Sequence, residues 1–272
     1  MHEPTPDLST MMEAARIAGA DLMRRFRDPS HLRVREKGPA DYVSNADLES
    51  QQTLKSILLG AHPARGFVAE EGAPEQVGQS VCGERYIVDP LDGTTNFLHG
   101  IAHFAVSIAL EKDGRIVAGV VFDPAKGEMF AAEHGRGAWA GGEAVRVCQD
   151  ADLSGALVAT GIPHSNARQR HARYLDTLGA MMGEAAGIRR LGAAALDLAY
   201  VAAGRFAVFF EFGLSPWDLA AGAFLVEEAG GRVTDPGGGD AFLATGNVLA
   251  TNGRLHPRAL ALLGAPPRPT GA

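Results

Sequence analysis

The most constraining feature of the sequence is the segment 87–97, which reads IVDPLDGTTNF. Its opening apolar residues predict a buried strand, and Pro90 and Gly93 predict a tight turn at the end of that strand. Asp89 and Asp92 are therefore expected to leave the strand end into a loop. Their carboxylate oxygens would be available there to a hard cation.

The residues that follow Asp92 predict the start of a short helix. The backbone N–H groups of Gly93, Thr94 and Thr95 would then lack partners within the helix and could donate to a phosphate. Cation ligands and phosphate donors in one short segment suggest metal-assisted phosphate chemistry. Because Asp-Pro and Asp-Gly pairs also occur in ordinary turns, this segment alone leaves a plain capped loop open.

Composition and charge narrow the class of protein. The 272 residues are enough for one large domain or two closely packed halves, and 46% hydrophobic with 21% charged residues is typical of a soluble globular chain. A net charge of −7 without a basic stripe argues against direct nucleic-acid binding. Two distant cysteines, Cys82 and Cys148, indicate neither a disulfide framework nor a zinc site. We expect a cytoplasmic protein with no signal peptide and no membrane contact.

Hydrophobic spacing predicts an α+β first half and an α/β second half. The first half is expected to contain helices at 7–27 and about 46–59, and strands at 66–69, 86–88, 104–110, 116–122, 128–131 and 137–139. The second half is expected to alternate between strands at 156–160, 187–190, 206–211 and 248–251 and helices at 166–183, 193–203 and 217–229. We place a boundary near residue 152, which gives halves of 1–152 and 153–265, and expect 266–272 to be a disordered tail.

Further acidic residues stand at the ends of predicted elements: Asp47, Glu70, Glu71, Glu211 and Asp218. Any one of them could be a helix cap or a solvated loop charge. If they converge, two unit charges about 4 Å apart cost roughly 4 kcal/mol at an effective dielectric constant of about 20. Such a cluster needs bound cations or raised pKa values. Because no His or Cys spacing accompanies it, oxygen ligands favour Mg²⁺ over zinc.

Three segments together resemble the signature segments of the inositol monophosphatase family. They are GFVAEEG at 66–72, VDPLDGTTNF at 88–97 and WDLAAG at 217–222, and the resemblance extends from residue 37 to residue 231. It implies a Mg²⁺-dependent, lithium-sensitive phosphatase with a layered αβαβα sandwich fold, usually a homodimer. Two or three Mg²⁺ ions per active site are expected.

The resemblance also implies a role for individual residues. The implied metal ligands are Glu70, Asp89, the Leu91 carbonyl, Asp92, the Thr94 hydroxyl and Asp218. The residues implied to orient and deprotonate the attacking water are Asp47, Glu70 and Thr94. The backbone donors to phosphate would be Gly93, Thr94 and Thr95, and the contacts to substrate hydroxyls would be Gly192, Ala194 and Glu211.

The chain departs from the family pattern at few positions. Tyr86 stands where Trp is frequent, Ser44 replaces a Thr and keeps the hydroxyl, and Ala193 stands where a small hydroxyl residue is common. No implied metal ligand is lost. The implied reaction is direct attack by water on a phosphomonoester, with two metal ions about 3.5–4 Å apart at the two ends of the displacement.

The substrate is the least constrained part of the interpretation. The GTTNF sequence resembles enzymes that act on inositol or a related polyol or sugar monophosphate. Relatives specific for histidinol phosphate or 3′-phosphoadenosine compounds more often have GTK there, and fructose 1,6-bisphosphate stays open as a substrate. A regulatory protein-interaction role on the same fold is the alternative from a different class.

Overall fold

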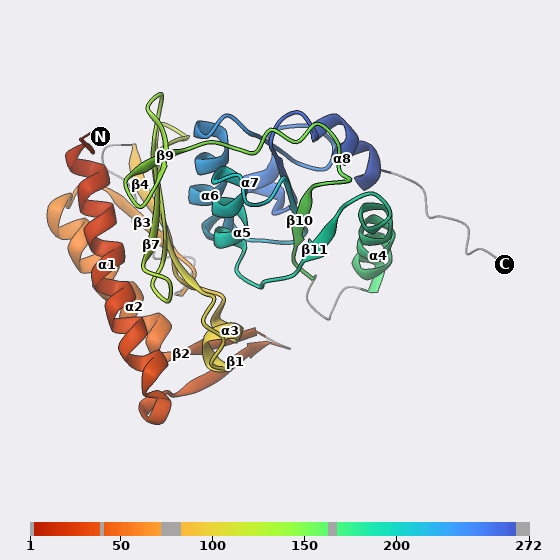
Figure 1. Ribbon diagram of the computed structural model, residues 1–272. Coiled ribbons are helices and arrows are strands. Elements are labelled where there is room, and N and C mark those ends of the chain that lie inside the picture. Colours follow the sequence, from red (N-terminus) through yellow and green to blue (C-terminus); the bar gives the residue numbers. More distant parts are fainter. Residues whose placement is uncertain (1–2, 39–40, 72–82, 163–167, 265–272) are drawn as a thin grey trace.

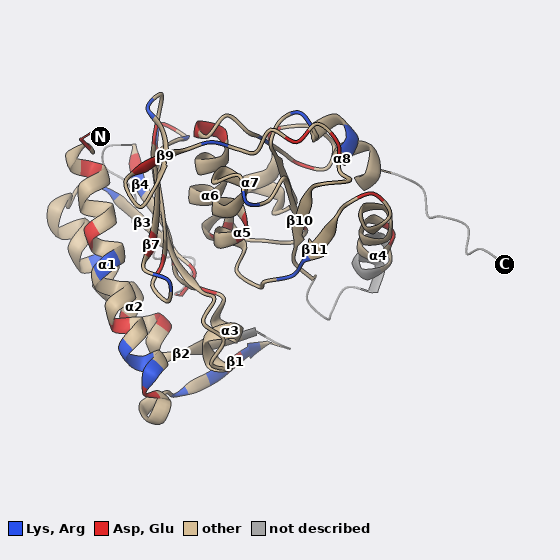
Figure 2. Cartoon of the chain, in the orientation of Figure 1, with Lys and Arg blue, Asp and Glu red and all other residues tan. Residues whose placement is uncertain are grey.

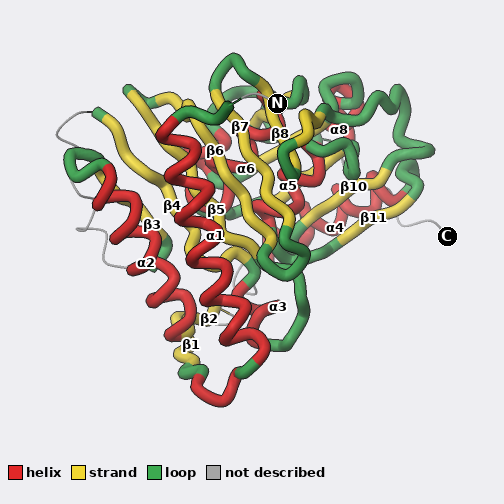
Figure 3. The backbone as a smooth tube through the Cα atoms, turned by 60° about the vertical axis from the view of Figure 1, so that its left-hand side comes forward, coloured by secondary structure: helices red, strands yellow, loops and turns green. Residues whose placement is uncertain are grey.

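Helices and sheets alternate in five layers (Figure 1). The computed structural model describes residues 3–38, 41–71, 83–162 and 168–264. The first layer consists of α1 (Pro6–Arg27) and α2 (Asn45–Ala61), which lie side by side across one face of the larger sheet (Figure 3). Buried leucine, methionine and alanine side chains line the inner face of α1, as its helical spacing predicts.

The second layer is a seven-stranded sheet in the order β3-β4-β5-β6-β7-β8-β9. Only β3 and β4 run parallel; every other neighbouring pair is antiparallel. The strands are β3 (Gly66–Ala69), β4 (Glu84–Asp92), β5 (Ala105–Lys112), β6 (Arg115–Asp123), β7 (Glu128–Glu133), β8 (Gly137–Ala140) and β9 (Glu143–Val145).

The fourth layer is a five-stranded sheet in the order β11-β10-β12-β14-β13. Its strands are β10 (Leu157–Thr160), β11 (Gly187–Arg189), β12 (Val208–Glu211), β13 (Arg232–Thr234) and β14 (Val248–Thr251). β10 is parallel to β11 and β12, whereas β14 is antiparallel to β12 and β13. The outermost layer contains α4 (Arg168–Met182) and α8 (His256–Leu263).

The third layer lies between the sheets and consists of α5 (Ala194–Ala202) and α6 (Pro216–Glu228). All of α5 and most of α6 are buried, because each helix contacts strands of both sheets. This apolar middle layer makes the two halves share one hydrophobic core. The observed order of layers confirms the predicted αβαβα sandwich.

Shorter elements complete the chain. β1 (Val34–Gly38) and β2 (Asp41–Ser44) form an antiparallel hairpin before α2, and α3 (Thr94–Leu98) follows β4. The 3-10 helix η1 (Pro29–His31) and the helix α7 (Phe242–Thr245) occupy connections.

The predicted elements are confirmed, with one correction at their ends. Asp89 and Asp92 do not lie in a loop beyond the strand, because β4 continues to Asp92. An irregularity in its pairing with β5 between these two residues accommodates Pro90, which has no N–H to donate. Several short elements were not predicted from the sequence: β1, β2, β9, β13, η1, α7 and α8. The predicted tail at 266–272 lies outside the described residues, and the division at residue 152 stays a prediction.

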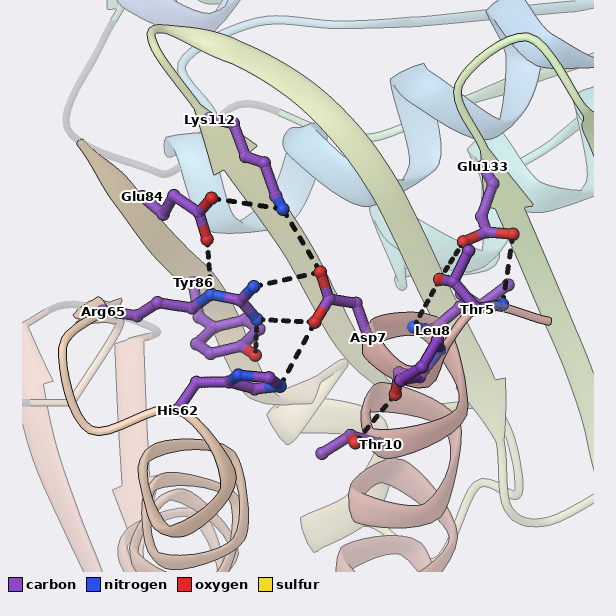
Figure 4. Close-up of polar contacts among 11 residues, drawn as sticks. Thr5, Asp7, Leu8, Thr10, His62, Arg65, Glu84, Tyr86, Lys112 and Glu133 are labelled. Atoms are coloured by element: carbon purple, nitrogen blue, oxygen red, sulfur yellow. Dashed lines mark hydrogen bonds and ion pairs between the residues drawn. The ribbon is translucent and has the colours of Figure 1, made fainter. Parts of the chain in front are cut away.

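A polar network joins the start of α1 to the edge of the larger sheet (Figure 4). The Asp7 carboxylate accepts two hydrogen bonds of 3.0 Å from the Arg65 guanidinium, and Lys112 Nζ lies 3.3 Å from it. Arg65 also donates to Glu84 at 2.6 Å and to the Tyr86 hydroxyl at 2.6 Å. Tyr86, the departure noted in the sequence, is therefore used as a hydrogen-bond acceptor within a buried contact.

Basic residues gather where α1 ends and β1 begins (Figure 2). Some of their charge is neutralised locally, since Arg25 pairs with Glu49 and Arg24 pairs with Asp21. The cluster is confined to this end of the molecule, so the chain presents no continuous basic stripe there. Within the described ranges, no helix is both long enough and apolar enough to cross a membrane.

Candidate active site

A cavity of about 440 Å³ opens where both sheets meet the middle helices. Residues from β4, the turn after it, and the starts of α5 and α6 line this cavity. It brings together all the predicted metal-ligating, phosphate-binding and substrate-binding residues: Glu70, Asp89, Leu91, Asp92, Gly93, Thr94, Thr95, Gly192, Ala194, Glu211 and Asp218. Asp47 is the one predicted site residue outside the cavity lining.

The turn after β4 depends on Gly93. Its φ of 88° lies in the left-handed region, which L-residues with a Cβ seldom adopt. A Cβ at this position would also come within 3.1 Å of the His103 carbonyl and 3.3 Å of the Gly192 carbonyl. The turn directs the chain into α3, so that Thr94 and Thr95 line the cavity at the start of that helix.

Asp47 is fully buried behind Thr94. Its Oδ2 accepts hydrogen bonds from the Ser44 N–H at 2.8 Å and the Ser44 hydroxyl at 2.6 Å, which form the capping box of α2. The Thr94 hydroxyl lies 3.0 Å from Asp47 Oδ1 and 2.9 Å from the Leu91 carbonyl, and its single hydrogen can serve one of these acceptors at a time. Burial raises the pKa of Asp47, and the hydrogen bonds from Ser44 and Thr94 oppose that rise.

Two further carboxylates are fixed by backbone N–H groups at helix starts. Asp92 Oδ2 accepts from the Ala195 N–H at 2.8 Å, in the first turn of α5. Asp218 Oδ2 accepts from the Ser215 N–H at 2.7 Å in the capping box of α6. Both side chains also line the cavity, so that each carboxylate is oriented from the protein side and exposed to the cavity on the other.

The carboxylates are electrostatically strained by burial and by one another. Burial raises the pKa of Asp92 to about 7, and the charges of Asp218 and Glu70 add to the rise. Burial also raises the pKa of Glu70 to about 7, although Lys37 Nζ, 2.8 Å from Glu70 Oε1, opposes it. The pKa of Asp89 is raised well above its usual value, first by burial and then by neighbouring carboxylates. Positive charge in the cavity would relieve this repulsion.

The donor chemistry of the cavity fits a hard divalent cation. Its charged acceptors are carboxylates, the Leu91 carbonyl and the Thr94 hydroxyl add neutral oxygens, and no His or Cys appears among the lining residues. Oxygen-only donor sets suit Mg²⁺ rather than zinc. In the described part of the chain, no three His, Cys, Asp or Glu side chains form a ready-made coordination group. The predicted ligands therefore share one cavity, and their coordination of metal stays a proposal.

Another part of the cavity wall carries the predicted substrate contacts. Gly192, with φ of 84°, and Ala194 stand at the start of α5, and Glu211 ends β12. Burial raises the pKa of Glu211 to about 8, with contributions from Asp218 and Asp92. Ala193, which lacks the hydroxyl common in the family, also lines this wall.

Several residues that line the cavity were not predicted as site residues from the sequence: Lys37, Tyr42, Gly161, Ile162, Arg190 and Trp217. Lys37 and Tyr42 belong to the β1–β2 hairpin, for which hydrophobic periodicity gave no signal. The position of Arg190 two residues before Gly192 could have identified it. Gly161 and Ile162 follow directly after a predicted strand, and the ends of parallel strands are common ligand sites.

The family model described as "Inositol monophosphatase family" matches residues 3–265. The chain belongs to this family. The match covers both sheets and the cavity between them, so the fold and the cavity belong to a family of phosphatases.

Individual relatives agree with this assignment. The chain is 49% identical over 245 residues to the inositol-1-monophosphatase of Rhizobium meliloti, covering 90% of this chain and 91% of the relative. It is 45% identical over 248 residues to Nus factor SuhB of Pseudomonas aeruginosa, covering 91% and 92%. Among solved structures, the extragenic suppressor protein suhB from Bartonella henselae superimposes with a TM-score of 0.90 at 46% identity, covering 94% of this chain and 97% of that one.

Proposed function

We propose that this family member hydrolyses inositol monophosphate, or a related polyol or sugar monophosphate, with Mg²⁺. The observation that carries the proposal is the composition of the cavity. It combines carboxylates whose pKa values are raised, a glycine turn leading into α3, and an acceptor wall around Glu211. This combination suits a substrate that has both a phosphate and hydroxyl groups.

The residues that would hold two or three Mg²⁺ ions are Glu70, Asp89, the Leu91 carbonyl, Asp92, the Thr94 hydroxyl and Asp218. When bound, these ions supply positive charge for the phosphoryl oxygens and make a neighbouring water more acidic. Hydrogen bonds at the starts of α5 and α6 keep the Asp92 and Asp218 carboxylates oriented before any ligand arrives.

Asp47 and Thr94 are proposed to take the proton of the attacking water. Thr94 Oγ1 donates its hydrogen toward Asp47 Oδ1, which leaves its lone pairs free to accept a hydrogen from water in the cavity. Burial of Asp47 raises its pKa and so makes its carboxylate a better proton acceptor. Glu70, on the cavity wall, would orient the same water.

The turn at Gly93 is proposed to hold the phosphoryl group. Backbone N–H groups of Gly93, Thr94 and Thr95 would donate to its oxygens, and fixed donors of this kind stabilise charge that develops in the transition state. Gly192, Ala194 and Glu211 would contact the hydroxyl groups of the substrate. The inositol-1-monophosphatase relative supports this choice of substrate class.

The test is phosphate release from inositol 1-phosphate, histidinol phosphate, 3′-phosphoadenosine 5′-phosphate and fructose 1,6-bisphosphate, each with and without Mg²⁺ and with added Li⁺. We expect Mg²⁺-dependent, Li⁺-inhibited turnover that is fastest with inositol 1-phosphate. Faster turnover of another of the four compounds would make that compound the proposed substrate. No turnover of any of them would reject the proposed activity.

A second candidate function is binding of a protein partner, because a relative of 45% identity carries the name Nus factor SuhB. A cell whose only copy carries Asp92→Asn separates the two functions. A normal phenotype in that cell, when deletion is harmful, would favour partner binding.

We also propose a homodimer, which light scattering of the purified chain would test.

A further inference from the structure

The carboxylate of Glu211 lies directly against Gly161. β10 and β12 pair in parallel with Thr160 opposite Phe210, so Gly161, directly after β10, lies beside Glu211, the last residue of β12. A Cβ built on Gly161 would overlap both carboxylate oxygens and the carboxylate carbon of Glu211. Only a residue without a side chain leaves room for this conformation of Glu211.

In this conformation no residue in the described part of the chain donates a hydrogen bond to the Glu211 carboxylate. The side chain is half-buried and lines the cavity, together with Gly161 and Ile162. The charge of Arg190 favours the ionised form of Glu211, whereas the buried Asp197 carboxyl, whose Oδ1 has no partner among the described residues, adds repulsion. An acceptor held in this way at a cavity wall leaves a lone pair that a ligand donor can satisfy.

We propose that Gly161 is a specificity-determining residue that sets the position of the Glu211 carboxylate, and thereby selects phosphate monoesters that also bear a hydroxyl group. This inference rests on the proposed function of the cavity and deepens it. Gly161 acts as a positioning residue, since the contact with the hydroxyl is made by Glu211.

A methyl group added at position 161 should therefore change the choice between substrates more than the rate of the hydrolysis step. In Gly161→Ala the Glu211 side chain must rotate away, and a polyol loses its acceptor while the residues around Asp92 and Thr94 are unchanged. A site built to bond a hydroxyl discriminates strongly against ligands that cannot satisfy it. We expect kcat/KM for inositol 1-phosphate to fall by about 10- to 100-fold, mainly through KM, and that for phenyl phosphate to change less than about threefold.

The experiment measures both substrates with the wild type, Gly161→Ala, Glu211→Ala and the double variant. If Gly161 acts through Glu211, the alanine at 161 has no further effect once Glu211 is removed. Equal losses with both substrates, or additive losses in the double variant, would overturn the proposal. Gly155→Ala is the matched control, because nothing lies within 4 Å of a Cβ there, and it should behave as wild type with both substrates.

Two measurements do not depend on turnover. Calorimetry in Ca²⁺ compares binding of inositol 1-phosphate and phenyl phosphate, and Gly161→Ala should lose the preference for the polyol. A crystal structure of that variant should show a rotated Glu211 side chain, and an unmoved carboxylate would reject the inference. If the wild type hydrolyses neither substrate, the proposed function fails, whereas these two measurements still decide the role of Gly161.

Discussion

The carboxylates that line the cavity are buried close to one another, and this placement raises their pKa values. Asp92 is buried and close to other acidic groups, and its pKa is raised to about 7 in consequence. Asp92 Oδ2 accepts a hydrogen bond from the Ala195 N–H, and an amide oxygen in its place could accept the same bond. We therefore propose that the negative charge of Asp92 serves cation binding rather than folding.

Asp92→Asn should separate activity from stability. We expect phosphate release to fall by about 100-fold or more, because the cavity loses one charge of its proposed cation site. In chelator the melting temperature should stay the same or rise, since a repulsive buried charge is gone. Calorimetry and a phosphate assay on the same preparation check both results. A variant with nearly wild-type turnover would contradict the proposed role of Asp92.

A second residue-scale prediction concerns His256, which is fully buried between the Thr234 and Thr251 hydroxyls, 3.0 Å from each. Burial lowers its pKa from 6.5 to about 4, and Arg232 adds to the shift. The folded state therefore resists protonation that the unfolded chain accepts. The stability that depends on neutral His256 is complete above pH 6.5 and is lost as the pH falls from 6.5 toward 4.

Urea unfolding of wild type and His256→Gln at pH 7.5 and pH 5 measures this effect. The wild type should lose more unfolding free energy between the two pH values than the variant does, since the variant has no imidazole to protonate. Other titrating groups are common to both proteins and cancel in the comparison. Equal losses in the two proteins would show that His256 is not the group responsible.

At the scale of elements, α3 and the loop before α5 are joined by one side chain. The amide nitrogen of Asn96 lies 2.8 Å from both the His103 and Leu191 carbonyls and 3.3 Å from the Gly192 carbonyl. It therefore fixes the turn at Gly93, the proposed phosphate site, relative to the cavity wall at Gly192.

Asn96→Ala should lower the free energy of unfolding by about 1–3 kcal/mol, because buried carbonyls lose their donor. It should also raise KM for inositol 1-phosphate, since the loop at Gly192 is no longer held. Gln52→Ala serves as the control, since the exposed Gln52 amide donates to the Ser56 hydroxyl on the helix surface, and it should change stability by less than about 0.5 kcal/mol. Denaturant unfolding and steady-state kinetics measure both variants, and a stability matching that of the control would count against the role of Asn96.

The sequence predicted those elements that carry a strong hydrophobic period and missed those that do not. The long helix at Pro6–Arg27 buries one clear apolar face, whereas β1 is mostly exposed and has no alternation to detect. β4 was predicted too short because Pro90 normally ends a strand, and the irregular pairing with β5 that tolerates it is a tertiary feature.

Part of the candidate site was predicted from the sequence, namely the residues that lie in local motifs. Asp89, Asp92 and Asp218 lie in segments whose local sequence is distinctive, so the motifs identify them. Gly161 and Arg190 enter the cavity only because strands distant in the sequence become neighbours in the smaller sheet. Their place follows from strand pairing, which no local pattern in one sequence specifies.

At the scale of the whole molecule, the two sheets are held together by close packing of α5 and α6. A Cβ on Gly222 of α6 would come within 2.6 Å of the Leu198 Cβ and 3.3 Å of the Ala195 carbonyl on α5. Since both helices begin at the cavity, their separation sets the distance between the Asp92 and Asp218 sides of the site.

Gly222→Ala should therefore destabilise the protein by about 1–3 kcal/mol through overpacking, and reduce activity as the helices move apart. Gly179→Ala is a matched control in α4, where nothing lies within 4 Å of an added Cβ. It should stabilise the helix by about 0.5–1 kcal/mol and leave activity unchanged. Thermal unfolding of both variants tests the pair, and similar effects of the two substitutions would contradict the packing argument.

We propose above that the carboxylates around Asp89 and Asp92 bind Mg²⁺ and that the protein uses it to hydrolyse a polyol phosphate. The most direct test of this proposal is a Mg²⁺ titration of chelator-treated protein, in which phosphate release from inositol 1-phosphate and the melting temperature are followed in the same samples. We expect turnover to be absent in chelator, and turnover and melting temperature to rise over the same range of Mg²⁺ concentration. Full turnover in chelator would rule out the proposed role of Mg²⁺. So would turnover that appears with Mg²⁺ while the melting temperature does not change.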